Sequence, residues 1–168
     1  IGSQITELEP FERAFRLMAE LAVTLKAQGH NIRHLDLGGG LGVPYRGTND
    51  VPPHPDEYAA MVKRTLGHLG LKYVLEPGRM IVGNAGILVS RVIYTKEGVD
   101  KTFTIVDAAM NDLPRPALYE AFHRIVPLAE PTPGTQPVHY DVVGPVCESG
   151  DWLGRDRAPA VQAGDRLA

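Results

Sequence analysis

The sequence predicts an α/β region followed by an all-β region. Residues 1–88 alternate short apolar strands with amphipathic helices, a rhythm typical of parallel strands joined by helical crossovers. Residues 89–168 lack this alternation and carry strand-like segments separated by turns. The 18 glycines and 14 prolines agree with many tight loops. We therefore expect two domains, 1–88 and 89–168, whose boundary lies near residues 84–90.

Composition and charge narrow the class of protein. Hydrophobic residues make up 43% of the chain and charged residues 22%, as in globular proteins. The net charge of -3 argues against a nucleic-acid-binding surface, which needs clustered positive charge. No apolar run approaches the roughly 18 to 20 residues that span a bilayer. The single cysteine, Cys147, excludes an internal disulfide and favours a reducing compartment, so we expect a cytoplasmic location.

Both ends of the chain have the character of internal sequence. Ile1 is not an initiator residue, and Val161–Ala168 reads as a turn that enters a strand. We therefore expect the chain to be an internal piece of a larger protein. The alternative is a small protein that is processed at its N-terminus.

A first helix is predicted near Glu9. Thr6 and Glu9 have the spacing of a capping box, Pro10 suits a first helical turn, and Gly29 ends the pattern. Apolar side chains recur on one stripe of this helix, at Phe11, Phe15, Met18, Ala22 and Leu25.

The remaining elements are predicted from the same patterns. A second helix starts at Pro55 and ends at Gly70, between strands at 32–37 and 71–75. The segment 80–88 fits either a helix or a strand. In the second half we expect a mainly antiparallel arrangement with a short helix and a loop. Its expected strands are 89–95, 101–106, 139–143 and 161–168, with the helix at 116–123 and the loop at 131–137.

A glycine-rich turn, Gly38–Gly42, follows the first predicted strand. Glycines allow the backbone to approach a ligand and present N–H donors, as phosphate-binding loops do. The turn lacks the third glycine of a dinucleotide fingerprint and the Gly-Lys-Ser/Thr of a Walker loop. A flexible turn without a ligand is the alternative.

A second polar motif, Glu76-Pro77-Gly78-Arg79, follows the next predicted strand. Ligands bind at the C-terminal ends of strands in α/β folds, so this position favours a site. Glu76 suits pairing with a protonated ring nitrogen, while Gly78 and Arg79 suit a phosphate or carboxylate. The alternative is a surface turn with a local Glu–Arg pair.

Two further motifs lie in the second half. Arg115 and Tyr119 have i, i+4 spacing on the short helix and could form a carboxylate clamp, or be an exposed arginine and a half-buried tyrosine. Cys147 and Glu148 lie in a polar, glycine-containing turn; a buried inert thiol is the alternative for Cys147. The scattered histidines and lone cysteine provide no metal-ligand spacing, so we expect no metal site.

Four motifs occur in one order: Leu37–Gly42, Glu76–Arg79, Met110–Pro116 and Cys147–Asp151. As a set they resemble the diaminopimelate decarboxylase family, fold-type III pyridoxal-phosphate enzymes of lysine biosynthesis, over nearly the whole chain. The resemblance implies the C-terminal part of a TIM-like (β/α)8 barrel followed by part of a β-sandwich or β-barrel domain. It implies decarboxylation of meso-2,6-diaminopimelate to L-lysine, with pyridoxal 5'-phosphate as cofactor.

The resemblance also assigns roles residue by residue. Cofactor-binding positions are Ser3, Gly39, Gly40, Glu76, Pro77, Gly78 and Arg79. Positions that bind the substrate are Arg79, Arg115, Tyr119 and Glu148. Cys147 is the implied catalytic proton donor. The segment after Arg79 is implied to be the last barrel helix, with its N-terminus toward the cofactor phosphate.

The family is implied to work as a homodimer in which Cys147 and Glu148 enter the neighbouring subunit's site. Its cofactor-linked lysine would lie before Ile1, so we expect this segment alone to be inactive. A decarboxylase of ornithine or arginine with the same fold is one alternative. A noncatalytic homologue that acts as a binding partner is the other.

Overall fold

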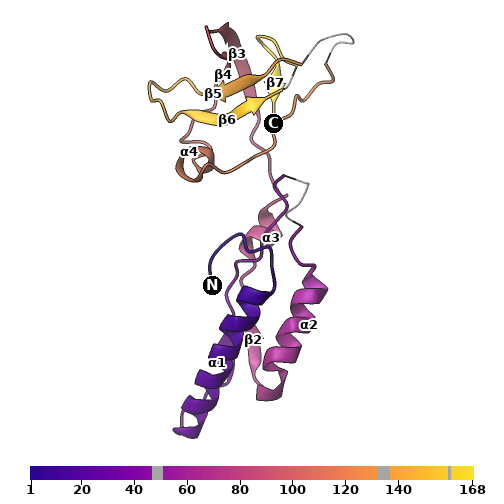
Figure 1. Ribbon diagram of the computed structural model, residues 1–168, viewed down its shortest axis with the longest axis vertical. Helices are drawn as coiled ribbons and strands as arrows, with labels where there is room; N and C mark the ends of the chain where they lie inside the picture. Colours follow the sequence, from indigo (N-terminus) through magenta and orange to yellow (C-terminus); the bar gives the residue numbers. More distant parts are fainter. Residues whose placement is uncertain (47–50, 132–136, 159) are drawn as a thin grey trace. The chain divides into compact units, whose positions relative to one another are not determined.

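The computed structural model describes residues 1–46, 51–131, 137–158 and 160–168. The predicted loop at 131–137 therefore lies largely outside the described residues. The chain divides into two compact units, Ile1–Gly86 and Ile87–Ala168, and this division falls within the range 84–90 expected for the boundary. Figure 1 labels the elements of both units.

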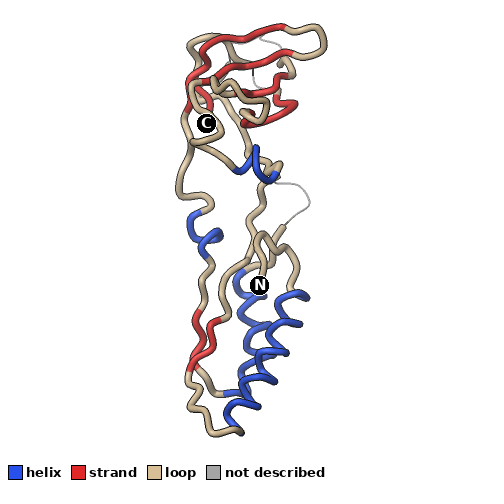
Figure 2. Tube along the Cα trace, turned by 90° about the vertical axis from the view of Figure 1, so that its left-hand side faces the viewer, coloured by secondary structure: helices blue, strands red, loops and turns tan. Residues whose placement is uncertain are grey.

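The first unit alternates helices and strands. Its elements are α1 (Glu9–Ala27), β1 (His34–Asp36), α2 (Pro55–Leu66), the 3-10 helix η1 (Gly67–Leu69), β2 (Lys72–Val74) and α3 (Gly78–Val82). β1 and β2 pair in parallel, with Leu35 opposite Tyr73. Figure 2 shows α1 and α2 side by side, with the paired strands along one side of them. The predicted parallel pairing with a helical crossover is confirmed for these two strands.

The core of the first unit lies between the two long helices and the strands. Phe11 and Phe15 on α1 and Met61 and Leu66 on α2 are fully buried. The Tyr58 ring meets the Phe11 ring edge-on, with centroids 5.2 Å apart, a favoured aromatic geometry. The predicted stripe of α1 therefore points into the core.

The N-terminal cap of α1 differs from the predicted one. The capping box between Thr6 and Glu9 is wrong, because Leu8 is the N-cap of α1 and no side chain caps it. α2 has the reciprocal cap instead: the Asp56 amide donates to the His54 ring, and the His54 amide donates to Glu57. Histidine is not among the usual cap residues, so the sequence pattern did not reveal it.

The second unit is a five-stranded mixed sheet with one short helix. Its elements are β3 (Ser90–Glu97), β4 (Thr102–Val106), α4 (Arg115–Tyr119), β5 (Tyr140–Val143), β6 (Trp152–Arg157) and β7 (Arg166–Leu167). The strand order is β6-β5-β4-β3-β7. A core of small and branched side chains lies against this sheet, at Val92, Val106, Ala108, Val142, Leu153 and Leu167.

Two features of this sheet depart from the expectation. β4 and β5 pair in parallel, whereas the other pairs are antiparallel. The long connection that carries α4 allows this, because parallel neighbours need a crossover. β6 was not predicted: Gly154, Arg155, Asp156 and Arg157 give its sequence neither an apolar run nor an alternation.

α1, with 19 residues, is the longest helix of the described residues. Among these residues, no helix is both long enough and apolar enough to cross a membrane.

Candidate functional site

The two predicted ligand-binding turns lie next to each other in the first unit. Backbone pairing continues past the ends of β1 and β2, because the Leu37 amide donates to the Val74 carbonyl at 2.9 Å and the Glu76 amide to the Gly38 carbonyl at 2.8 Å. The glycine turn therefore runs beside Glu76.

A third chain segment reaches the same edge. The Ile5 amide donates to the Gly40 carbonyl at 2.9 Å, and the Gly42 amide to the Ile5 carbonyl at 3.0 Å. Ile5 and Leu41 thereby form a parallel bridge. Three parallel chain segments thus end together, the position where α/β folds bind ligands.

The glycines of the first turn are required by the close approach of the backbone. A Cβ on Gly39 would lie 2.2 Å from the Glu76 carbonyl oxygen. Gly40 has a φ of +99°, and a Cβ there would lie 2.9 Å from the Gly2 carbonyl oxygen. These contacts explain Gly39 and Gly40 without a ligand. Backbone hydrogen bonds from Ile5 and Glu76 also hold the turn.

Gly78 differs from those glycines. Nothing lies within 4 Å of the position of an added Cβ, and its φ is not left-handed. Packing within the described chain therefore does not require a glycine at Gly78, and open space adjoins its backbone. Gly78 begins α3, which has five residues, so the expected last barrel helix forms little more than one turn here.

Arg79 points toward Ser3 and Tyr45. Its Nη2 donates to the Ser3 Oγ at 2.7 Å, and its Nη1 donates to the Tyr45 hydroxyl. Its guanidinium carbon also lies 5.7 Å from the centroid of the Tyr45 ring. Within the described residues Arg79 forms no ion pair with Glu76, so the alternative of a local Glu–Arg pair is wrong. Sequence reasoning missed Tyr45, whose one signal is its position just after the glycine turn.

The proposed carboxylate clamp lies in the second unit. α4 begins at Arg115 and ends at Tyr119, so both side chains belong to one short helix. Arg115 is partly buried, and its Nη1 lies 3.1 Å from the Nε2 of His123. Tyr119 is 73% exposed rather than half-buried. His123 was not singled out from the sequence, because nothing in its spacing connects it to Arg115.

Cys147 and Glu148 lie in the turn between β5 and β6, and both are exposed. The alternative of a buried thiol is therefore wrong for the described chain. The Glu148 carboxylate accepts hydrogen bonds from the Gly150 amide and the Ser149 hydroxyl, each at 3.0 Å. These two donors favour the charged form and lower the pKa of Glu148 below its usual value of 4.5. The turn thus presents a thiol beside an anion.

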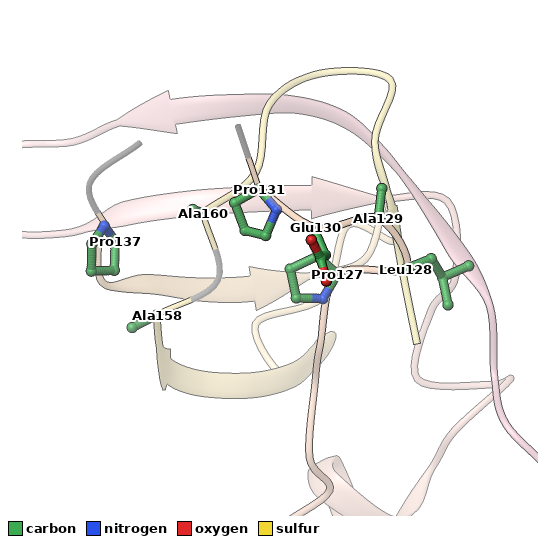
Figure 3. A pocket seen from close by; sticks show the side chains of 8 residues that line it. All are labelled: Pro127, Leu128, Ala129, Glu130, Pro131, Pro137, Ala158 and Ala160. Atoms are coloured by element: carbon green, nitrogen blue, oxygen red, sulfur yellow. The ribbon is translucent and has the colours of Figure 1, made fainter. Parts of the chain in front are cut away.

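The described residues contain no group of three or more His, Cys, Asp or Glu side chains that could hold a metal ion. Figure 3 shows a pocket of the second unit, and none of the predicted site residues lines it. Its lining consists of Pro127, Leu128, Ala129, Glu130, Pro131, Pro137, Ala158 and Ala160.

The predicted site residues form two sets. Those of the first unit meet at one edge: Ser3, Gly39, Gly40, Glu76, Pro77, Gly78 and Arg79. Those of the second unit lie on α4 and on the β5–β6 turn: Arg115, Tyr119, Cys147 and Glu148.

Comparisons with known proteins relate nearly the whole chain to one family. A diaminopimelate decarboxylase of Vibrio cholerae is 52% identical over all of this chain, which covers 40% of that protein. The crystal structure of diaminopimelate decarboxylase from Helicobacter pylori, complexed with L-lysine, matches 99% of this chain and 41% of its own, with a TM-score of 0.90 and 42% identity.

A lysine/ornithine decarboxylase from Vibrio vulnificus, complexed with cadaverine, matches with a TM-score of 0.85 at 23% identity over 99% of this chain and 45% of its own, and so shows the fold alone. This chain thus spans about two fifths of the length of its curated relatives. The family model for the pyridoxal-dependent decarboxylase C-terminal sheet domain matches residues 17–168. The chain therefore belongs to the pyridoxal-dependent decarboxylases.

Proposed function

We propose that the chain is the C-terminal part of an enzyme that decarboxylates meso-2,6-diaminopimelate to L-lysine with pyridoxal 5'-phosphate. The family match and the identity to diaminopimelate decarboxylases support this proposal. The observation that carries it is the meeting of Ser3, the Gly38–Gly40 turn and the Glu76–Arg79 turn at one edge.

The residues present fit the cofactor. Open space adjoins the Gly78 backbone, and Arg79 and Ser3 lie at the same edge with donors suited to a phosphate. Glu76 is exposed there, and its carboxylate would stabilise the protonated form of the ring nitrogen. When bound, the cofactor supplies an electron-withdrawing ring that stabilises negative charge at the substrate α-carbon.

The second unit supplies the groups that recognise and protonate the substrate. The Arg115 guanidinium and Tyr119 hydroxyl bind the distal carboxylate, and the Glu148 carboxylate binds the distal amino group. The Cys147 Sγ holds the proton that is delivered to the α-carbon. A substrate with charges of both signs at its far end matches this combination better than ornithine does.

The whole protein is proposed to complete the site. The segment at Ile5 and strands β1 and β2 supply the last strands of a (β/α)8 barrel, and the cofactor-linked lysine lies in the part before Ile1. In a cytoplasmic homodimer, Cys147 and Glu148 serve the partner subunit's site. Their exposure in the described chain supports this arrangement.

The test is the substrate preference of the whole protein and of its Arg115→Ala variant. We expect the whole protein to prefer meso-2,6-diaminopimelate. Arg115→Ala should lower kcat/KM for it roughly 10- to 100-fold, since a hydrogen bond between charged groups contributes about 1.5–3 kcal/mol. Arg124→Ala, at an exposed arginine outside the proposed site, is the matched control. Preference of the unaltered protein for ornithine or arginine would favour the alternative decarboxylases.

A further inference from the structure

Asp151 is a buried carboxylate with no role in the function proposed above. Asp151 is only 3% exposed and lies on the turn that leads into β6. Buried charged groups are costly unless they are fully hydrogen-bonded. The hydrogen-bond donors to the Asp151 carboxylate therefore indicate its structural role.

The carboxylate of Asp151 joins two separate turns. Its Oδ1 accepts a hydrogen bond from the Met110 amide at 2.6 Å, and its Oδ2 accepts one from the Val146 amide at 2.7 Å. Both are short bonds from backbone N–H groups to carboxylate oxygens, a stronger class than bonds between neutral groups.

The backbone of Asp151 closes the turn that holds the proposed proton donor. Its amide donates to the Glu148 carbonyl at 3.0 Å, and its carbonyl accepts from the Gly144 amide at 3.0 Å. Cys147 lies inside this closed turn. Its position is therefore set by a residue that also holds Met110.

Met110 lies on the turn that leads to Arg115. The Asp112 side chain accepts from the Ala109 amide at 2.9 Å, and the Asp112 amide donates to the Ala109 carbonyl at 2.9 Å. The Leu118 amide then donates to the Pro114 carbonyl at 2.9 Å as α4 starts. Met110 thus lies in a closed turn that only Leu113 and Pro114 separate from the start of α4.

Gly144 provides the room for this arrangement. A Cβ at that position would lie 2.4 Å from the Asp151 Oδ2 and 2.7 Å from the Ala108 carbonyl oxygen. The carboxylate is thus packed directly against the backbone on the side of Gly144. This close fit leaves the carboxylate little freedom to move between its two amide donors.

We propose that Asp151 is a positioning residue that holds the turn of Cys147 and the turn before Arg115 in one fixed arrangement, so that each residue is presented to the site that it serves. It acts through two backbone amides and touches neither substrate nor cofactor. The inference rests on the proposed function, in which Cys147 donates a proton and Arg115 binds the distal carboxylate. Its consequence is that loss of the carboxylate weakens recognition of the substrate, and not only the fold.

The test uses the whole protein with its cofactor and the variant Asp151→Asn. This change keeps the size of the side chain but sets an NH2 group against one of the two amide donors. We expect KM for meso-2,6-diaminopimelate to rise roughly tenfold and kcat to fall. Simple destabilisation would reduce the active fraction and leave KM unchanged. Hydrogen exchange should also quicken at the Met110 and Val146 amides.

Asp141→Asn is the matched control. Asp141 is another sheet carboxylate that accepts a backbone amide, that of Asp156 at 2.9 Å, and it has no place in the proposed site. Its variant should leave KM unchanged. If Asp151→Asn does not fold, Asp151→Ser is measured in the same way, because serine is smaller and still offers an acceptor.

The outcomes separate the two proposals. If Arg115→Ala weakens substrate recognition while the Asp151 variants leave KM unchanged, the positioning role is overturned and the proposed function stands. Failure of both Asp151 variants to fold assigns the residue a purely structural role and also overturns the inference. If the unaltered protein does not decarboxylate meso-2,6-diaminopimelate, the proposed function itself fails.

Discussion

The two units place their site residues by different means. In the first unit backbone contacts bring the proposed site residues together: strand ends pair, and Gly39 packs directly onto the Glu76 carbonyl. In the second unit the proposed site residues lie on a short helix and on a turn, most of them exposed, and one buried carboxylate, Asp151, joins that turn to the turn before the helix. Substitutions in the two units should therefore fail differently.

This difference between the units predicts which substitutions lower stability and which lower activity alone. A backbone contact cannot be altered without moving the chain, so changes at the glycine turn should damage the fold and cofactor binding together. Exposed side chains such as Cys147 can be removed at little cost to stability. Comparing activity with stability in variants of each unit tests this distinction.

The largest effect is expected for Gly39→Ala in the first unit. The added Cβ would lie 2.2 Å from the Glu76 carbonyl oxygen, and neither backbone can yield without breaking strand pairing. We expect a loss of about 3 kcal/mol or more, at the upper end for overpacking, with loss of bound cofactor. Thermal unfolding and cofactor absorbance of the whole protein measure both.

Gly67→Ala is the control in the same unit. Nothing lies within 4 Å of the added Cβ, and the residue has a right-handed helical backbone. Stability should be unchanged or slightly higher. A Gly39→Ala protein that unfolds like the unaltered one and retains cofactor would contradict the distinction between the units.

The next largest effect is expected for Cys147→Ala in the second unit. Removal of the proton donor should lower kcat for meso-2,6-diaminopimelate by roughly 10²- to 10⁴-fold, the usual contribution of general acid catalysis. Because the side chain is exposed, stability should change by no more than about 0.5 kcal/mol.

Steady-state kinetics and thermal unfolding of the whole protein check the Cys147 prediction together. Val146→Ala, at an exposed side chain on the same turn, is a control that leaves the thiol and the contacts of Glu148 in place. An unchanged kcat in Cys147→Ala would remove the proton-donor role. If activity and stability were both lost in Cys147→Ala, this turn would instead behave like the glycine turn, where fold and function fail together.

The smallest effect concerns the charge of Glu148. The Gly150 amide and Ser149 hydroxyl lower its pKa, so its charged form favours the folded turn. That contribution is complete above the usual pKa of 4.5 and is lost as the pH falls through the lowered pKa. Ser149→Ala should move the pKa of Glu148 back toward 4.5.

Carbon NMR of the labelled Glu148 carboxyl group in the whole protein follows this titration directly. Glu148→Gln identifies the signal by its disappearance. A Glu148 titration at or above 4.5 in the unaltered protein would show that the two donors do not act on the carboxylate.

Local patterns predicted much of the fold. Helix α1 followed from the spacing of Phe11 and Phe15, and α2 from the signals at Pro55 and Gly70. β6 was not predicted because its polar residues show no strand periodicity. Its position in the sheet, rather than a sequence pattern, allows these residues in a strand. The parallel pairing of β4 with β5 depends on the path of a long connection, which short-range patterns do not record.

Candidate site residues could be named from the sequence where a residue type carries its own chemistry. Glycine turns, Glu76–Arg79 and the turn with Cys147 are visible as motifs in the printed sequence. Tyr45 and Asp151 act through contacts between segments distant in the chain, with Arg79 and Met110 respectively. Such residues become apparent only when the strand ends and turns are placed in space.

The most direct test of the account is a crystal structure of the whole protein with pyridoxal 5'-phosphate bound. The account predicts the phosphate beside the Gly39–Gly40 turn and Gly78, with the Glu76 carboxylate against the ring nitrogen. Cofactor density elsewhere, with both turns empty, would contradict it.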